Sequence, residues 1–214
     1  CFTGMTVLIK WLNAYPAPLQ AIYAQVTALI ILLPAICRDP RGIFLTRRPV
    51  AFGVRALCST LGVMLYYFAF QTIPLAEANA LSFTRTLWIA PLAALLLHER
   101  VGWVRWGLLG LGFAGVLLVI RPDALGGFSW PHAAAIASAL LLAMAVIGVK
   151  SLTADHSTLS ILSWSAVLGS LFSLPIALLH WRWPSPDDFA LLLALGALSV
   201  GAQLSYIRGM SEGD

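Results

Sequence analysis

The chain has 214 residues, of which 60% are hydrophobic and 10% are charged, and its formal net charge is +4 at pH 7. A soluble domain carries roughly 45 to 50% apolar and about 25% charged residues, so this composition excludes a water-soluble globular protein. The positive charge does not indicate a nucleic-acid partner, because the arginines gather in short connectors beside apolar runs, where they set membrane orientation. We therefore expect a multi-pass integral membrane protein that lies in a lipid bilayer.

Apolar runs of the length that crosses a bilayer core, about 20 residues for about 30 Å, follow one another along the chain. Turn-forming residues separate them, for example the two prolines between Asn13 and Pro18. The first run starts at Cys1 with no basic segment before it, which indicates that the front of the protein is missing. We predict an all-α, polytopic transmembrane helix bundle with eight spans, at about 1–12, 18–37, 50–71, 75–97, 103–120, 129–149, 158–180 and 187–207.

Basic residues divide unevenly between the two ends of these spans. With the link after the second span in the cytoplasm, the basic residues inside are Arg38, Arg41, Arg47, Arg48, Arg100, Arg105, Lys150 and Arg208. Those outside are Lys10, Arg121 and Arg182. Cytoplasmic loops carry the excess of basic residues, so we expect this orientation, in a bacterial inner membrane.

The chain also repeats itself weakly. Lys10 and Leu19 recur as Lys150 and Leu159, at a shift of 150 − 10 = 140 positions, and each pair brackets a helix end, a polar link and the next helix. Five spans lie within one period, and an odd number makes the second copy enter the membrane upside down. This inverted repeat of five-helix units is the plan of many secondary transporters, and it predicts ten spans in a complete protein.

Two consecutive stretches carry a more specific signature. Residues 74–101 read PLAEANALSFTRTLWIAPLAALLLHERV, and residues 103–122 read WVRWGLLGLGFAGVLLVIRP. They resemble the EamA-like branch of the drug/metabolite transporter superfamily, in which a Pro-Leu-Ala helix start, an apolar helix, a closing Glu-Arg and a Gly-rich helix before Arg-Pro recur. The resemblance implies a ten-helix inverted-repeat carrier with a central cavity, moving metabolites, amino acids, nucleotide-like compounds or drugs. We expect a first EamA-like repeat over 1–123 and a second, cut after its third helix, over 124–214.

Arg85 stands near the middle of the fourth span. An arginine there costs about 2.5 to 3.5 kcal/mol even on insertion-based scales, so its side chain must face protein or water. We interpret it as a fixed cation that binds an anionic group of the substrate, such as a carboxylate or a phosphate. The alternative is a structural partner for carbonyl groups or a glutamate of another helix.

Polar side chains share one face of the second span, since Gln20, Tyr23 and Thr27 are three and four residues apart. Lipid would not accept this face, so we expect it to point into the bundle. Under the shift of 140, Gln20 and Tyr23 correspond to Ser160 and Ser163, so matching helices of both halves offer polar groups to a cavity at the repeat interface. Interhelical hydrogen bonding alone is the competing interpretation.

Four further side chains combine a flat or long body with a polar tip, which suits a pocket for a flat organic ligand but also suits helix packing. They are Tyr66, Tyr67, Gln71 and Trp88. Lys10, near the end of the first span, either lines the cavity or extends its ammonium to the membrane interface. Glu77, at the start of the fourth span, is either a proton-coupling carboxylate or a charge favoured by the helix dipole.

The chain contains no G-x-x-x-x-G-K-[ST] loop, so transport would draw on gradients or exchange rather than on ATP. The G-x-G-x-x-G pattern at residues 110–115 lies inside an apolar span and lacks the strand that a dinucleotide site requires. We therefore predict a secondary transporter of a small organic solute, without catalytic, cofactor-binding or metal-binding residues. Proton or ion coupling and a homodimer stay open. The alternatives are a membrane-embedded enzyme using His132, His156 or His180, and a non-transporting membrane subunit or sensor.

Overall fold

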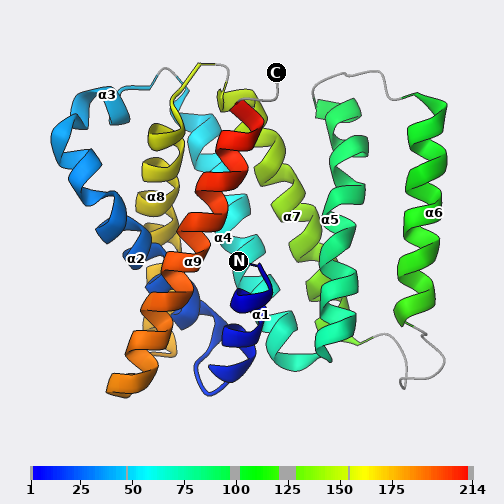
Figure 1. Ribbon diagram of the computed structural model, residues 1–214, viewed down its shortest axis with the longest axis horizontal. Helices are drawn as coiled ribbons and strands as arrows, with labels where there is room; N and C mark the ends of the chain where they lie inside the picture. Colours follow the sequence, from blue (N-terminus) through cyan, green and yellow to red (C-terminus); the bar gives the residue numbers. More distant parts are fainter. Residues whose placement is uncertain (1, 47, 97–101, 121–128, 154, 212–214) are drawn as a thin grey trace.

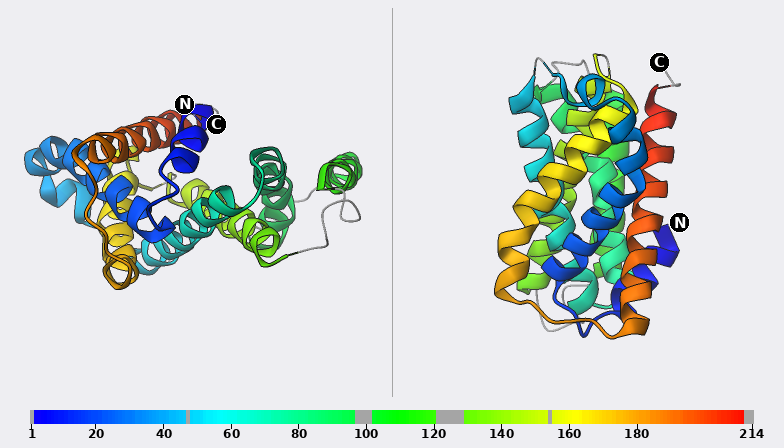
Figure 2. Two further views of the ribbon diagram at one scale, coloured as in Figure 1. Left: turned by 90° about the horizontal axis from the view of Figure 1, so that it is seen from below. Right: turned by 90° about the vertical axis from the view of Figure 1, so that its left-hand side faces the viewer.

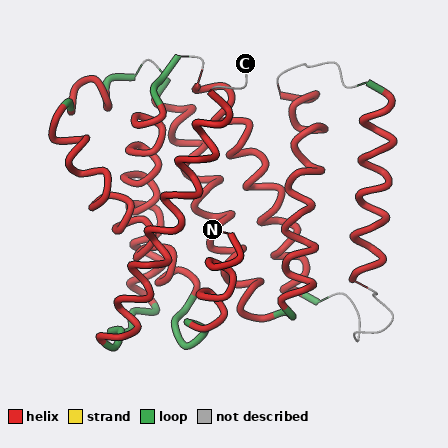
Figure 3. The backbone as a smooth tube through the Cα atoms, viewed as in Figure 1, coloured by secondary structure: helices red, strands yellow, loops and turns green. Residues whose placement is uncertain are grey.

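The structure is a computed structural model that describes residues 2–46, 48–96, 102–120, 129–153 and 155–211. Within these residues the chain is helical and contains no β-strand (Figure 3). The helices are α1 (Phe2–Trp11), α2 (Ala17–Arg38), α3 (Pro40–Phe44), α4 (Pro49–Thr72), α5 (Leu75–Leu96), α6 (Trp103–Ile120), α7 (Trp130–Thr153), α8 (Thr158–Leu179) and α9 (Pro186–Ser211). The predicted spans match α1, α2 and α4 to α9 to within a few residues.

Among the described residues, five helices are long and apolar enough to cross a membrane: α2, α4, α7, α8 and most of α9. α6 is also apolar, but its span is shorter. The long helices stand side by side and alternate in direction along the chain, as a polypeptide that crosses a bilayer repeatedly must do (Figure 1). The prediction of an all-α polytopic bundle is therefore confirmed, and the chain is an integral, multi-pass membrane protein.

The short helix α3 lies in the link between α2 and α4, where the sequence pattern indicated only a turn. Pro40 at its first position has the backbone angle that a helix start requires, and the Asp39 side chain accepts a hydrogen bond from the Gly42 backbone N–H at 2.9 Å. Five residues are too few to show helical periodicity in the sequence.

The bundle has two ends with different links. The end that holds the α2–α4 link, which we call the arginine-rich end, also holds the α7–α8 link (Figure 1). There Arg48 pairs with Asp155 at 3.3 Å, and Thr46 lies 3.0 Å from a ring nitrogen of His156. At the opposite end, the Tyr15 hydroxyl donates to Asp188 at 2.7 Å and so ties the α1–α2 link to the start of α9.

The long helices pack against one another in a small number of pairs. α2 and α8 run antiparallel and pack on each other. α4 packs on α7 and α8, while α9 packs on α1 and α2, and the second view in Figure 2 shows the helices crossing at small angles. Glycines allow the closest of these approaches, since a Cβ at Gly196 of α9 would lie 2.5 Å from the Cβ of Thr27 on α2.

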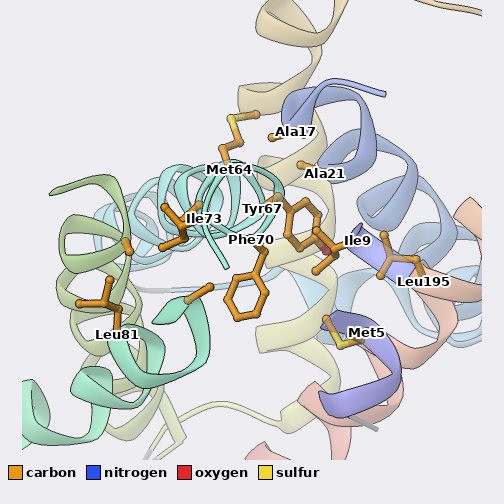
Figure 4. Packing of buried hydrophobic residues seen from close by; sticks show 13 residues of the cluster. Met5, Ile9, Ala17, Ala21, Met64, Tyr67, Phe70, Ile73, Leu81 and Leu195 are labelled. Carbon is orange, nitrogen blue, oxygen red and sulfur yellow. The ribbon is translucent and has the colours of Figure 1, made fainter. Parts of the chain in front are cut away.

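The largest buried cluster lies where α1, α2, α4, α5 and α9 meet, and Figure 4 shows its side chains. Tyr67 and Phe70 of α4 stand at its centre, each 1% exposed, with Ile9 of α1 and Leu195 of α9 around them. This cluster holds the C-terminal half of α4 in place. It thereby fixes the backbone from which Tyr66 projects.

α6 stands at the edge of the bundle (Figure 1). Within the described residues it packs on α5 and makes at most marginal contact with other helices. The two helices approach closely at Gly112, where a Cβ would lie 2.6 Å from the Leu87 side chain. Most of the remaining surface of α6 is apolar and exposed, for example Leu111 at 72% and Leu118 at 76%, as a surface in contact with lipid must be.

Candidate functional site

Arg85 lies in the middle of the 22-residue helix α5 and is half-buried. The neighbouring Leu81 and Thr84 are buried on the α5 face that packs against α7. Arg85 follows Thr84 directly, so its side chain lies at the edge of this face rather than at its centre. Its positive charge acts on the hydroxyls of Tyr66 from α4 and Tyr206 from α9. The guanidinium makes no hydrogen bond or ion pair with any residue that the structure describes. Within the described residues this cation therefore has no counter-charge, and it lies near Tyr66 of α4 and Tyr206 of α9.

Trp88 follows Arg85 by three residues and therefore lies on the same side of α5. Its ring meets the Phe113 ring of α6 edge-on, with centroids 5.4 Å apart and planes at 75°. The indole Nε1 is buried and has no hydrogen-bond partner in the described part of the chain. Buried indole N–H groups normally have a partner. One turn of α5 thus presents two donors without acceptors.

Tyr66 forms an aromatic wall on the neighbouring helix α4. Its ring centroid lies 4.3 Å from that of Phe70 and 6.0 Å from that of Tyr67. Because Tyr67 and Phe70 belong to the buried cluster, they restrict the Tyr66 ring. Arg85 and Tyr66, two of the predicted substrate-binding residues, therefore come from neighbouring helices and lie near each other, whereas Trp88, one turn from Arg85 on α5, packs against α6.

Gln20, Tyr23 and Ser163 lie elsewhere. The Gln20 amide is fully buried and donates to the Leu12 carbonyl at 2.8 Å, which closes the α1–α2 link. Tyr23 packs beside the Trp181 ring, 6.1 Å away. These two stand near the start of α2 at the opposite end of the bundle, whereas Ser163 stands near the start of the antiparallel α8 at the arginine-rich end. At 1.5 Å per residue, Gln20 and Ser163 are roughly 20 Å apart along the helix axes.

Unused hydrogen-bonding capacity remains at two of these positions. The Gln20 Oε1 and the Ser163 hydroxyl are both buried without a partner among the described residues. Buried polar groups of this kind are uncommon and call for an acceptor, a donor or a water. Lys10, by contrast, is engaged: its ammonium donates to the Ile73 carbonyl at 3.3 Å, at the end of α4.

Glu77 and His132 form a buried pair that the sequence did not reveal, because they are 55 positions apart. His132 Nε2 lies 3.2 Å from Glu77 Oε2, and the two residues are 7% and 8% exposed. Ser129 Oγ lies 2.7 Å from the other ring nitrogen. The pair joins the starts of α5 and α7 at the opposite end of the bundle. His156 stands at the arginine-rich end, beside Thr46.

Arg55 is a second charged residue inside an apolar helix, and the sequence analysis missed it. It is 5% exposed, and its guanidinium donates to the Ser165 hydroxyl of α8. Its Nε is buried without a partner among the described residues. The signal was present in the sequence, since a charge six residues into a predicted span has the same meaning as Arg85.

Comparison with known proteins gives one family. The model of the EamA-like transporter family matches residues 1–121 and 129–214. A solved crystal structure of another protein covers 98% of this chain and 77% of its own, with a TM-score of 0.65 and 21% identity, which supports the same fold.

Three characterised relatives carry transport names. The S-adenosylmethionine uptake transporter of Rickettsia prowazekii is 30% identical over 78% of this chain and 57% of its own length. The pseudopaline exporter CntI of Pseudomonas aeruginosa UCBPP-PA14 is 26% identical over 99% of this chain and 75% of its own length. The riboflavin transporter of Rhizobium johnstonii is 29% identical over 94% and 68%, respectively. The chain thus spans little more than half the length of the Rickettsia protein.

Proposed function

The chain belongs to the EamA-like transporter family, and from this premise we propose that it serves in a secondary transporter that moves a small organic solute by alternating access. The relatives named above act on S-adenosylmethionine, pseudopaline and riboflavin, which are all small organic molecules. One is named for uptake and one for export, so the direction of transport does not follow from the family. Bacterial relatives favour a bacterial inner membrane as the location.

Alternating access needs two units that rock against each other around a central site. We propose the two inverted repeats over 1–123 and 124–214 as these units. The helix contacts support this division, because α1, α2 and α4 correspond to α7, α8 and α9. Under this correspondence the α4–α7 contact becomes the α9–α1 contact, and α4–α8 becomes α9–α2. The α2–α8 contact corresponds to itself, because each of these helices is the counterpart of the other, and the two run antiparallel.

The unpaired guanidinium of Arg85 is the observation that carries the substrate proposal. A charge in the middle of a membrane helix is retained where it has a partner or a water-filled cavity. No described residue supplies the counter-charge, so we assign that role to an anionic group of the solute. The Trp88 indole N–H, one turn along α5, adds a second donor, and the Tyr66 ring of α4 adds a flat apolar surface near Arg85. Together they suit an organic anion with a planar part.

The Glu77–His132 pair supports coupling to a proton. His132 contacts a buried carboxylate at the junction of α5 and α7, and histidine and carboxylate side chains inside membrane bundles are typical members of proton relays. Ser129 contacts the other ring nitrogen of His132 at 2.7 Å. We expect Glu77→Gln to remove the dependence of solute flux on an imposed pH gradient while leaving solute exchange intact. Uptake driven equally well by the gradient in this variant would refute the coupling role.

Uptake by purified protein in proteoliposomes tests the proposed function. A panel of radiolabelled organic anions, with neutral analogues of similar size, would be offered to the wild type and to Arg85→Ala. We expect saturable flux of at least one anion, and its loss in Arg85→Ala at unchanged membrane insertion. Arg105→Ala is the matched control, since this arginine is exposed at the start of α6. Undiminished flux in Arg85→Ala would remove the site assignment.

The same experiment separates the alternatives. Saturable flux by the purified protein alone excludes a non-transporting subunit or sensor. A membrane-embedded enzyme would instead change its substrate chemically, which mass spectrometry of the recovered solute detects. His132 and His156 stand at opposite ends of the bundle, so they cannot act on one substrate atom together.

A further inference from the structure

A cavity of about 650 Å³ opens between α4 and α7 at the arginine-rich end. Arg48 stands at its mouth and Arg55 at its inner wall, and Val54, Met144, Ile147 and Ser151 supply part of the remaining lining. The described lining contains no carboxylate. The nearby Asp155 pairs with Arg48 at 3.3 Å, but both side chains are about half exposed, so water weakens this pair. The cavity is therefore positively charged.

Arg55 gives the cavity a cation whose side chain is held in place and cannot reach the solvent outside the bundle. Its residue is 5% exposed, one guanidinium nitrogen donates to Ser165, and Nε has no partner among the described residues. Gly148 of α7 leaves room for the stem of this side chain, since a Cβ there would lie 3.2 Å from the Arg55 Cβ. Ser165 is neutral, so the hydrogen bond leaves the charge uncompensated. An anion in the cavity would compensate it.

Helix α4 adds to the same potential. It starts at Pro49, at the cavity mouth, and its cap residue Arg48 makes no side-chain hydrogen bond to the first turn. The first backbone N–H groups of a helix lack intrahelical acceptors and attract anions, phosphate above all. The buried Arg55 is an independent second feature that points to the same class of ligand.

The surface beside the cavity indicates where the anion comes from. Val50 and Val54 line the cavity and are 76% and 54% exposed, and Leu57 and Leu61 continue at helical spacing at 43% and 38%. These four residues form an apolar stripe that runs from the cavity mouth down the outside of α4. An acyl chain of a phospholipid can lie along this stripe while its headgroup occupies the cavity, which a soluble phosphate compound cannot do.

We propose that this cavity binds the phosphate group of an anionic phospholipid, with Arg55 and Arg48 as its cationic partners and the Val50 to Leu61 stripe under an acyl chain. The site belongs to the membrane leaflet at the arginine-rich end, the end predicted to face the cytoplasm. Basic pockets between helices on that side recognise lipid headgroups. The inference does not depend on Arg85 or on transport.

Retention of lipid by the purified protein tests the proposal. The protein would be assembled in nanodiscs of phosphatidylcholine with a minor fraction of phosphatidylglycerol, then released and analysed by native mass spectrometry. We expect the wild type to retain phosphatidylglycerol in preference to phosphatidylcholine. Arg55→Gln should lower this preference about tenfold, the effect of one charge-assisted contact. Arg105→Gln, which removes a charge at the same end but outside the cavity, should retain it.

A second pair of variants keeps Arg55 in place, in case Arg55→Gln fails to fold. Ser151 lines the cavity, so Ser151→Asp would add a carboxylate that occupies the arginines and repels a phosphate. Ser151→Asn has nearly the same shape without the charge. We expect the aspartate variant to lose the lipid preference and the asparagine variant to keep it.

Thermal unfolding distinguishes the two sources of a phosphate group. We expect phosphatidylglycerol nanodiscs to raise the unfolding temperature of the wild type above that in pure phosphatidylcholine, and Arg55→Gln to lose this rise. Excess inorganic phosphate in pure phosphatidylcholine should not reproduce it. The lipid site is overturned if inorganic phosphate gives the same rise. It is equally overturned if wild type, Arg55→Gln and Ser151→Asp retain phosphatidylglycerol alike.

Discussion

Arg85 and Arg55 both place a guanidinium inside an apolar helix, but their surroundings differ. Arg85 is half-buried near two tyrosine hydroxyls, and Trp88, three residues along α5, has an indole N–H without a partner among the described residues. Arg55 is almost fully buried, is held by Ser165 across a helix contact, and faces a cavity at one end of the bundle. A charged residue in a membrane helix thus marks a site, but its neighbours on other helices decide what kind of site it is.

Charge reversal at Arg85 is the substitution with the largest expected difference between the Arg85 and Arg55 sites. We expect Arg85→Glu to lower flux of an anionic solute by at least about 100-fold, because it removes a charge-assisted contact and adds repulsion. Phosphatidylglycerol retention should not change. Proteoliposome uptake and native mass spectrometry measure the two effects. Lipid loss in this variant would mean that the two arginines belong to one site.

Crowding tests whether the Arg55 side is fixed by packing. Gly148→Val would place methyl groups against the Arg55 stem, so we expect a loss of about 1 to 3 kcal/mol in stability. Gly53→Val is the matched control, because a Cβ at Gly53 meets nothing within 4 Å. Thermal unfolding in detergent measures both. Equal unfolding temperatures would show that Arg55 can move aside freely.

Lysine substitution separates charge from geometry. Arg85→Lys keeps the charge but loses the planar set of donors, so we expect roughly a tenfold fall in solute flux. Arg55→Lys should leave flux unchanged, because we propose that the cavity that it lines binds lipid and lies outside the transport site. The two variants would be compared by initial uptake rate. An unaltered rate in Arg85→Lys would reduce its role to a point charge.

Substitution of Lys10 is expected to have the smallest effect on solute flux. Its ammonium contacts only the Ile73 carbonyl among the partners described, and this contact lies near the end of α4. We expect Lys10→Gln to change flux by less than about twofold and to lower stability by about 0.5 to 1 kcal/mol. Uptake and thermal unfolding measure this. A flux loss as large as that of Arg85→Ala would place Lys10 in the substrate site after all.

The sequence was sufficient for the helices but not for most of the contacts. Apolar runs are long and obligatory in a membrane, where each backbone group must be satisfied within its own helix, so all the predicted spans have a helix. Helix α3 was not predicted because its backbone is fixed by Asp39 and Pro40 rather than by a hydrophobic pattern. The Glu77–His132 pair escaped because nothing in either local sequence identifies a partner 55 positions away.

The predicted site shows the same division. Arg85 and Tyr66 lie near each other because α4 and α5 are consecutive helices joined by a short link, while Trp88 packs against α6. Tyr23 and Ser163 were matched by the repeat, but equivalent positions on antiparallel helices stand at opposite ends unless they lie near the middle. Arg55 required no structure for its discovery, since its place inside an apolar run was visible. Its bond to Ser165 required one.

The position of α6 at the edge of the bundle has a consequence for sequence divergence. A helix that meets the rest of the described chain chiefly through α5 is constrained at few positions, Gly112 and Phe113 among them. At the other positions of α6, contact with lipid requires only that the side chains are apolar and that the helix is long enough. Drift among leucine, valine, isoleucine and phenylalanine along its outer surface is therefore close to neutral. We expect such substitutions on the outer surface of α6 to leave the packing of the other described helices unchanged.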